Sequence, residues 1–178
     1  MFPRHGELFP PRYLPKVPLD RRVFAFAVDF GAVSLFSLAG GSSLVIPLFI
    51  LAWLGLRVLV VEKTRGQSLG RWLFDIKVAD PRSGATPGLQ ELFKRETLTG
   101  ISALLALIGL INLSPTNGLI LIAPIPLLLD CGFAFTDAEY RQAFHDRFVG
   151  TVMVQTRRGY SLDIKLKKLF AQASRRVK

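Results

Sequence analysis

Cysteine is almost absent from the sequence. Cys131 is the single cysteine among 178 residues, so an intrachain disulfide and a metal site built from cysteines are both excluded. Cys131 lies within an apolar run, where a free cysteine usually behaves as a small hydrophobic residue. We expect neither a metal ion nor a cofactor.

Motifs of catalysis and of nucleic-acid recognition are also missing. The sequence has no Gly-x-Ser-x-Gly elbow, no His-Glu-x-x-His pair and no two carboxylates at glycosidase spacing. The stretch 66–70 contains two glycines but lacks the spacing of a phosphate-binding loop. Zinc-finger spacing, aromatic RNA-binding boxes and helix-turn-helix patterns do not occur. We therefore expect that the protein is not an enzyme and binds no nucleic acid.

Apolar residues, in contrast, are abundant. They make up 50% of the chain, and the mean hydropathy is +0.36. They form long runs and are not spread at amphipathic spacing, which is typical of a membrane protein. The formal net charge of +10 suits a lipid bilayer with anionic head groups at its cytoplasmic face.

Four apolar runs predict four transmembrane helices. They cover residues 21–39, 44–61, 98–113 and 119–135. Turn-forming residues follow the first run at 40–43 and the third at 114–118. Pro124 and Pro126 are expected to kink the fourth helix or to break its early turns.

The polar segments predict smaller elements. Strands are expected at 72–79 and 150–155, with 150–155 pairing with 76–79, and an interfacial helix at 89–96. Leucines and basic residues at helical spacing predict a basic amphipathic helix near the C-terminal end. The expected fold is an all-α membrane protein with four transmembrane helices, a cytoplasmic loop with a short β-hairpin, and that amphipathic helix.

The chain divides into three parts. Residues 1–20 form a proline-rich tail without the apolar core of a signal peptide, 21–155 the membrane domain and 156–178 the basic helix. Every lysine and arginine except Arg57 lies in the tail through Arg22, in the segment between the second and third runs, or after the fourth run. The positive-inside rule therefore predicts that both termini are cytoplasmic, in a plasma, inner or other energy-coupling membrane.

Three charged residues interrupt the apolar runs at a similar depth. Asp29, Arg57 and Asp130 lie roughly 7–11 Å from the cytoplasmic ends of their runs, at about 1.5 Å per residue. A lone charge is costly in a bilayer, so we expect a buried cluster in which Arg57 bridges the two aspartates. Arg22 lies two helical turns before Asp29 on the same face and joins the predicted cluster. The alternative is that Arg57 and Asp130 extend separately to the head groups.

Four motifs, in order along the chain, resemble the RDD family of small membrane proteins, which is named for one arginine and two aspartates. Arg22 and Asp29 resemble the arginine and the first aspartate, and Asp146 the second aspartate. The supporting motifs are Arg65-Gly-Gln-Ser-Leu-Gly-Arg71 followed by Asp75-Ile-Lys-Val, Lys94-Arg95-Glu96, and Arg141-Gln-Ala-Phe-His-Asp146. Arg71 stands where the family usually has a lysine.

The resemblance implies a role in transport, with ion or proton exchange suggested for some family members. It also points to a cytoplasmic motif, whose members are Arg95, Glu96, Arg141, Gln142, His145 and Asp146. Within this motif, His145 and Asp146 could act as a proton relay, because histidine titrates near neutral pH. The alternative is that the pair caps the last helix and ties it to the preceding loop.

Two classes of function follow from these observations. In the first, the protein is a component that transports or exchanges an ion, a proton or Na⁺, through its buried charges, with Asp29 as the carrier carboxylate. In the second, it is an accessory or assembly subunit of a larger membrane complex, and the buried charges only hold the helices together. Four short helices barely enclose a pathway, so we expect a homo-oligomer or a partner membrane protein.

Overall fold

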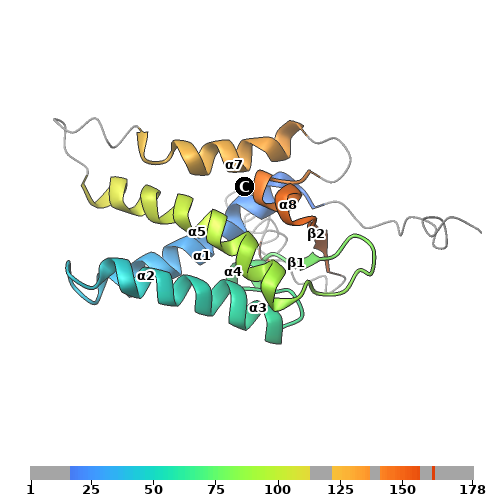
Figure 1. Ribbon diagram of the computed structural model, residues 1–178, viewed down its shortest axis with the longest axis horizontal. Helices are drawn as coiled ribbons and strands as arrows, with labels where there is room; N and C mark the ends of the chain where they lie inside the picture. Colours follow the sequence, from blue (N-terminus) through green and yellow to red (C-terminus); the bar gives the residue numbers. More distant parts are fainter. Residues whose placement is uncertain (1–16, 113–121, 137–140, 157–161, 163–178) are drawn as a thin grey trace, which may run out of the picture.

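The computed structural model describes residues 17–112, 122–136, 141–156 and Leu162. Within them, long helices run alongside one another, and short helices and strands gather at one end (Figure 1). The elements are α1 (Leu19–Leu38), α2 (Val45–Leu54), η1 (Gly55–Leu59), α3 (Val60–Lys63), α4 (Leu69–Leu73), β1 (Ile76–Ala79), α5 (Leu89–Ile111), α7 (Ile125–Thr136), α8 (Phe144–Val149) and β2 (Val152–Gln155).

The first two predicted runs form helices within a few residues of the expected bounds. Helix α1 covers the first run, and α2, η1 and α3 form one continuous helix, Val45–Lys63. Segment η1 is a turn of π-helix, which inserts an extra residue into the helical repeat and changes the direction of the side chains. Arg57 lies in this turn.

The helix that contains the third apolar run is longer than predicted. The expected interfacial helix at 89–96 and the expected transmembrane helix at 98–113 are one uninterrupted helix, α5. Its start is stabilised by Glu91, whose carboxylate accepts a hydrogen bond from the backbone N–H of Gly88 at 3.1 Å. The separation into two helices is wrong because no residue between Glu96 and Leu98 breaks the helix. Arg95 and Glu96 therefore lie inside a long helix.

Among the described residues, Val45–Lys63 is the one helix that is long and apolar enough to cross a membrane by length and composition. Helix α1 carries Asp29 and two arginines, and the uncharged part of α5 begins only after Glu96. Helix α7 has 12 residues and begins at Ile125, between the two prolines that were expected to break its early turns. The turn at 114–118 and the start of the fourth run lie outside the described residues.

The two strands pair as an antiparallel sheet, with Ile76 opposite Gln155 and Ala79 opposite Val152. The pairing of 76–79 with the segment after Gly150 is the predicted one. The term hairpin is wrong, however, because α5, α7 and α8 separate the strands in the sequence. Residues 72–75 are not strand either, because α4 continues through Leu73.

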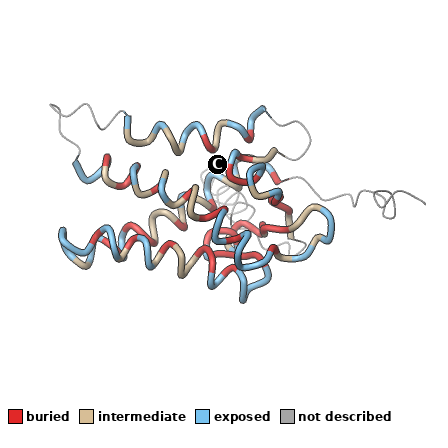
Figure 2. The backbone as a smooth tube through the Cα atoms, viewed as in Figure 1, coloured by how far each residue is buried: buried red, intermediate tan, exposed pale blue. Residues whose placement is uncertain are grey.

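Two large apolar clusters and a small one at the strands lie in the interior of the described part. One lies between α1, α2 and α5, where Val33, Phe49, Trp53 and Leu107 pack together. The other lies at the end with the short elements, where buried residues gather (Figure 2). The side chains of its centre are Val61, Ile76, Val78 and Leu92, all fully buried.

The outer faces of the long helices are apolar. Exposed aliphatic and aromatic side chains occur on α1, α2, α5 and α7, for example Phe36, Leu51, Ile101 and Leu128. Soluble proteins rarely expose so much contiguous apolar surface, whereas a helix in lipid must do so. Most of the proline-rich tail and of the basic helix lies outside the described residues, which include only 17–20 of the tail and Thr156 and Leu162 of the basic helix. Val17 and Leu162 pack in the cluster around Ile76, and α1 already begins at Leu19.

Candidate functional site

Buried residues of alternating charge form a continuous network across the interior. In order of contact they are Arg22, Asp146, Arg95, Glu96, Arg57 and Asp29, with Arg71 also bound to Glu96. We call these seven residues the charge network. Helices α1, α4, α5 and α8 and segment η1 each contribute at least one member. The network therefore ties together elements that lie far apart in the sequence.

Asp29 lies at one end of the network and is fully buried in α1. Its Oδ2 accepts hydrogen bonds from Arg57 Nη1 at 2.9 Å and Ser68 Oγ at 2.5 Å. Its Oδ1 accepts a hydrogen bond of 2.7 Å from the backbone N–H of Gly70. Both oxygens of Asp29 are therefore occupied by groups of the protein.

Gly70 brings α4 against α1. A Cβ at this position would lie 2.0 Å from the backbone oxygen of Ala25, so no residue with a side chain fits without movement of the backbone. Ser68 caps the same helix through a 3.4 Å hydrogen bond from the backbone N–H of Arg71. The Gly-Gln-Ser-Leu-Gly-Arg motif thus packs against α1 and supplies two hydrogen-bond donors to Asp29.

Glu96 is the centre of the network. Its Oε1 accepts hydrogen bonds from Arg71 Nη2 at 2.6 Å and Arg95 Nη1 at 2.7 Å, and its Oε2 accepts one from Arg57 Nε at 2.6 Å. The Arg57 guanidinium also lies 4.8 Å from the ring centroid of Trp53, within cation–π range. Three guanidinium groups thus share one carboxylate.

Arg71 is a buried arginine with one incompletely paired end. Burial, together with repulsion from Arg57, lowers the pKa of Arg71 to about 9, which leaves it protonated at neutral pH. Its Nη2 binds Glu96, but its Nη1 is buried and has no hydrogen-bond partner within the described part of the chain.

Asp146 lies at the other end of the network, in α8. Its Oδ2 accepts a 2.5 Å hydrogen bond from Arg22, and its Oδ1 accepts bonds from Arg95 at 2.8 Å and Thr151 at 3.2 Å. Burial alone would raise the pKa of the Asp146 carboxyl, but the charges of Arg95 and Arg22 hold that pKa well below its ordinary value. Arg22 also donates to the backbone carbonyl of Arg141.

Asp130 is not bridged by Arg57, which corrects the predicted cluster. Both oxygens of Asp130 accept hydrogen bonds from His145, one from the backbone N–H at 2.9 Å and one from the ring Nδ1 at 2.6 Å. Arg57 instead bridges Asp29 and Glu96. Arg22 shares α1 with Asp29 but binds Asp146. Gln142, from the predicted cytoplasmic motif, donates a 2.8 Å hydrogen bond to the backbone oxygen of Thr151.

The contacts of His145 involve both ring nitrogens. Its Nδ1 lies 2.6 Å from Asp130 Oδ2, and its Nε2 lies 3.2 Å from Arg95 Nη2 and 3.6 Å from Asp146 Oδ1. A guanidinium can only donate hydrogen bonds, so the contact with Arg95 requires Nε2 to accept and the ring proton to lie on Nδ1, toward Asp130. His145 is thus held between an arginine and two carboxylates.

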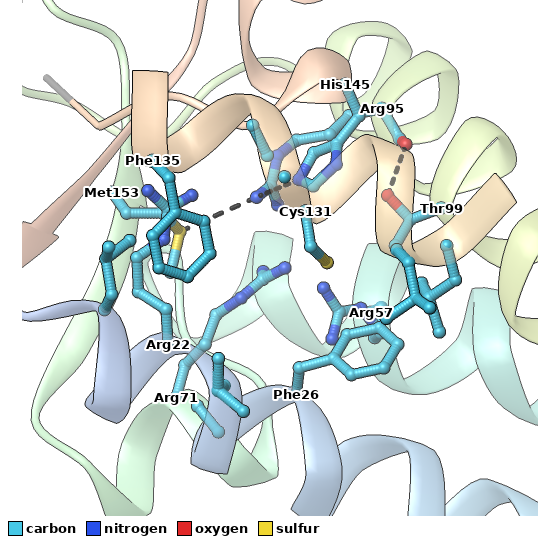
Figure 3. Close-up of a pocket in the computed structure, with 17 residues that line it drawn as sticks. Arg22, Phe26, Arg57, Arg71, Arg95, Thr99, Cys131, Phe135, His145 and Met153 are labelled. Carbon is cyan, nitrogen blue, oxygen red and sulfur yellow. Dashed lines mark hydrogen bonds between the residues drawn. The ribbon is translucent and has the colours of Figure 1, made fainter. Parts of the chain in front are cut away.

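Two cavities border His145 and Asp130. The first has a volume of about 330 Å³ and is lined by His145 together with Arg22, Arg57, Arg71 and Arg95. Figure 3 shows these side chains reaching the same space from different elements, beside Cys131. The second has a volume of about 290 Å³ and is lined by Asp130, Ser102 and apolar side chains. His145 therefore faces the first cavity, and Asp130 faces the second.

The RDD family model matches residues 16–150, which is most of the chain. The chain belongs to the RDD family. No curated protein and no solved structure matches it. The resemblance described from the motifs is thus confirmed, and the protein is a membrane protein of the RDD type.

The structure connects the three residues that resemble the name-giving arginine and aspartates of the RDD family. Arg22 binds Asp146 directly, and Arg95, Glu96 and Arg57 link Asp146 to Asp29. The sequence did not predict the central role of Glu96, which was expected at the membrane surface.

Other contributions were also missed. Arg71, Ser68 and the backbone of Gly70 were seen only as parts of a motif. A serine before a short helix and a glycine two residues later are the available signals for them. Among the described residues, no group of three or more histidine, cysteine or acidic side chains could hold a metal ion.

Proposed function

We propose that the protein is a multi-pass transport component that exchanges protons for Na⁺ or another ion, and that His145 and Asp130 carry the proton. The observation that supports this proposal is the position of the pair. His145 lines one cavity and Asp130 lines the other, and a 2.6 Å hydrogen bond joins them. A proton taken up by His145 from the first cavity crosses one hydrogen bond to reach Asp130, whose carboxylate faces the second cavity.

Protonation of His145 would change its contacts with the charged groups around it. Arg95 from α5, Asp130 from α7 and Asp146 from α8 face the ring, and Arg22 from α1 reaches it through Asp146. A proton on Nε2 would replace an acceptor by a donor, so the contact with Arg95 would be lost. Uptake of a proton at His145 would thereby be linked to movement of Arg95, which also binds Glu96 and Asp146.

This proposal moves the proton carrier from Asp29 to Asp130. Asp29 is fully buried and accepts three hydrogen bonds from the protein, two of them at one oxygen. A carrier carboxylate must release such partners in every cycle. Asp130, in contrast, lines a cavity, and His145 is its one hydrogen-bond partner in the described part of the chain.

The proposed arrangement in the membrane has four spans, formed by α1, Val45–Lys63, α5 and the segment that ends in α7. Exposed apolar side chains on all four support it. The distribution of basic residues supports cytoplasmic termini and a charge network in the cytoplasmic half of the membrane. A homo-oligomer or a partner membrane protein would complete the pathway.

The test is proton flux in liposomes that contain the purified protein and an internal pH-sensitive dye. An imposed Na⁺ gradient is expected to change the internal pH with the wild-type protein. His145→Gln and Asp130→Asn are expected to lower the rate by at least about 100-fold, the scale of a lost proton-transfer group. His5→Gln, which changes the only other histidine, is the matched control. Well-folded variants with the wild-type rate would refute the proposal.

A second candidate function is that of an accessory or assembly subunit. It is favoured by the saturation of Asp29, Glu96 and Asp146, whose oxygens all accept hydrogen bonds from the protein. Extraction from the native membrane in mild detergent distinguishes the two functions. A homo-oligomer without other stoichiometric subunits agrees with transport, whereas one copy bound in a larger complex agrees with the accessory role.

A further inference from the structure

We infer that the cavity lined by the four arginines binds the anionic head group of a membrane lipid. The cavity lies between α1 and α7. Helix α1 packs against α2 and α4, whereas α7 packs against α5 and α8. Helices α1 and α7 therefore form opposite walls of the cavity. The inference does not depend on proton exchange, because it concerns an occupant of the cavity and not a flux.

The charged wall of the cavity has one sign. Among the described residues that line it, Arg22, Arg57, Arg71 and Arg95 carry charge, and none is a carboxylate. The acidic partners Asp29, Glu96 and Asp146 are in the charge network but not in the cavity wall. An anion in the cavity would therefore meet guanidinium groups without facing a carboxylate, which is the complementarity that an anionic head group requires.

Arg71 offers an unused donor. Its side chain is 2% exposed and lines the cavity, and its Nη1 atom has no hydrogen-bond partner among the residues that the structure describes. An unsatisfied buried polar group is costly, and more so when it is charged. An anionic oxygen beside Nη1 would satisfy it. Arg57 and Arg71 both bind Glu96 and both line the cavity (Figure 3), so one head group can contact more than one guanidinium.

The apolar residues of the cavity wall favour an amphiphilic ligand over a free ion. Apolar side chains of α1 and α7 line the cavity, and three of them, Val23, Leu128 and Phe135, are more than half exposed. In a membrane protein this exposed rim faces lipid chains. A head group can thus enter the cavity from the bilayer while its acyl chains stay along the apolar rim. The volume of about 330 Å³ is enough for the head group and adjoining carbons, but not for a whole lipid.

Gly132 provides a variant that fills the cavity without replacing a residue of the charge network. It lines the cavity, and nothing lies within 4 Å of the position its Cβ would take. Gly132→Phe is therefore expected to fold and to occupy the space of the head group. Gly31→Phe is the matched control, since Gly31 in α1 is equally unobstructed but does not line the cavity.

The first arm of the experiment is native mass spectrometry of the full-length protein. The protein is extracted in mild detergent from vesicles with equal amounts of phosphatidylcholine and anionic phosphatidic acid. The wild-type protein and Gly31→Phe are expected to retain one phosphatidic acid, with about tenfold or greater preference over phosphatidylcholine. Gly132→Phe and Arg71→Gln are expected to lose this preference. Equal preference in folded Gly132→Phe would overturn the inference, because the lipid would then bind elsewhere on the basic surface.

The second arm uses Cys131, the only cysteine, which also lines the cavity. Alkylation of Cys131 in phosphatidylcholine vesicles is expected to slow by about tenfold or more when phosphatidic acid is added, as one charge-assisted contact predicts. Inorganic phosphate alone is expected to give no protection. Equal protection by inorganic phosphate would show a site for free anions and would overturn the assignment to lipid. This arm needs only the wild-type protein, so it decides even where a variant fails to fold.

Discussion

The Nε atom of Arg57 donates a 2.6 Å hydrogen bond to Oε2 of Glu96, and this contact joins η1 to α5. Both residues are buried, so neither charge is solvated by water. A buried ion pair adds little net stability compared with apolar residues, but removal of one partner leaves the other charge unpaired. Because Glu96 also accepts hydrogen bonds from Arg71 and Arg95, its loss affects three arginines at once.

Glu96→Gln is therefore expected to destabilise the protein by about 3–5 kcal/mol, the cost of breaking a buried ion pair. Thermal unfolding in detergent, followed by size exclusion, measures the effect. Lys94→Gln is the control on the same helix, because Lys94 is exposed, and its effect is expected to stay within about 0.5 kcal/mol. Equal stability of the two variants would show that the charge network does not hold α5 in place.

Gly70→Ala is expected to prevent the close packing of α4 on α1. The added Cβ would meet the backbone oxygen of Ala25 at 2.0 Å, and backbone cannot move aside as a flexible side chain can. Overpacking of this kind costs about 1–3 kcal/mol or more, and the shift of α4 would also weaken the hydrogen bond to Asp29.

The comparison for this variant is Gly31→Ala, measured by the same unfolding assay. Gly31 lies inside α1 with nothing within 4 Å of a Cβ, so alanine is expected to be neutral or to stabilise the helix by up to about 1 kcal/mol. A Gly70→Ala variant as stable as Gly31→Ala would contradict the observed packing.

Asp146 is expected to make stability depend on acid pH. Its folded pKa lies below its unfolded value of about 3.9, so the unfolded chain binds a proton first as the pH falls. The stabilisation is fully present above pH of about 4–5 and is lost as the pH drops toward the folded pKa. Unfolding midpoints measured from pH 7 downward test this.

Asp146→Asn is the matched variant for the acid titration. It is expected to be less stable at neutral pH and to lose part of the acid dependence, because asparagine does not titrate. If the unfolding midpoint of Asp146→Asn fell as steeply below a pH of about 4 as that of the wild-type protein, the acid dependence would belong to other carboxylates.

His145 is expected to be neutral with its proton on Nδ1, since Arg95 can only donate to Nε2. Nitrogen NMR of protein labelled at histidine distinguishes the two tautomers and the charged ring. The sequence has two histidines, so His5→Gln leaves the signal of His145 alone. A proton found on Nε2 at neutral pH would contradict the hydrogen bonding described here and would weaken the proposed relay.

Much of the fold follows from the sequence alone. Uncharged runs and the glycine-rich turn after the first run predicted α1 and the helix Val45–Lys63, because helical residues in lipid must be apolar over a defined length. The alternation around Val152 predicted its strand and the pairing with β1. The motifs around Arg22 and Asp146 were enough to identify the family.

The partners of the buried charges were decided only by the tertiary structure. Depth along a helix follows from counting residues, but residues at equal depth can face in different directions, by about 100° for each step along the helix. The π-helical turn η1 redirects Arg57, and the unbroken helix α5 carries Glu96 into its reach, so Glu96 takes the place expected for Asp130. Asp130 instead meets His145 on α8, a contact that depends on the packing of α7 against α8.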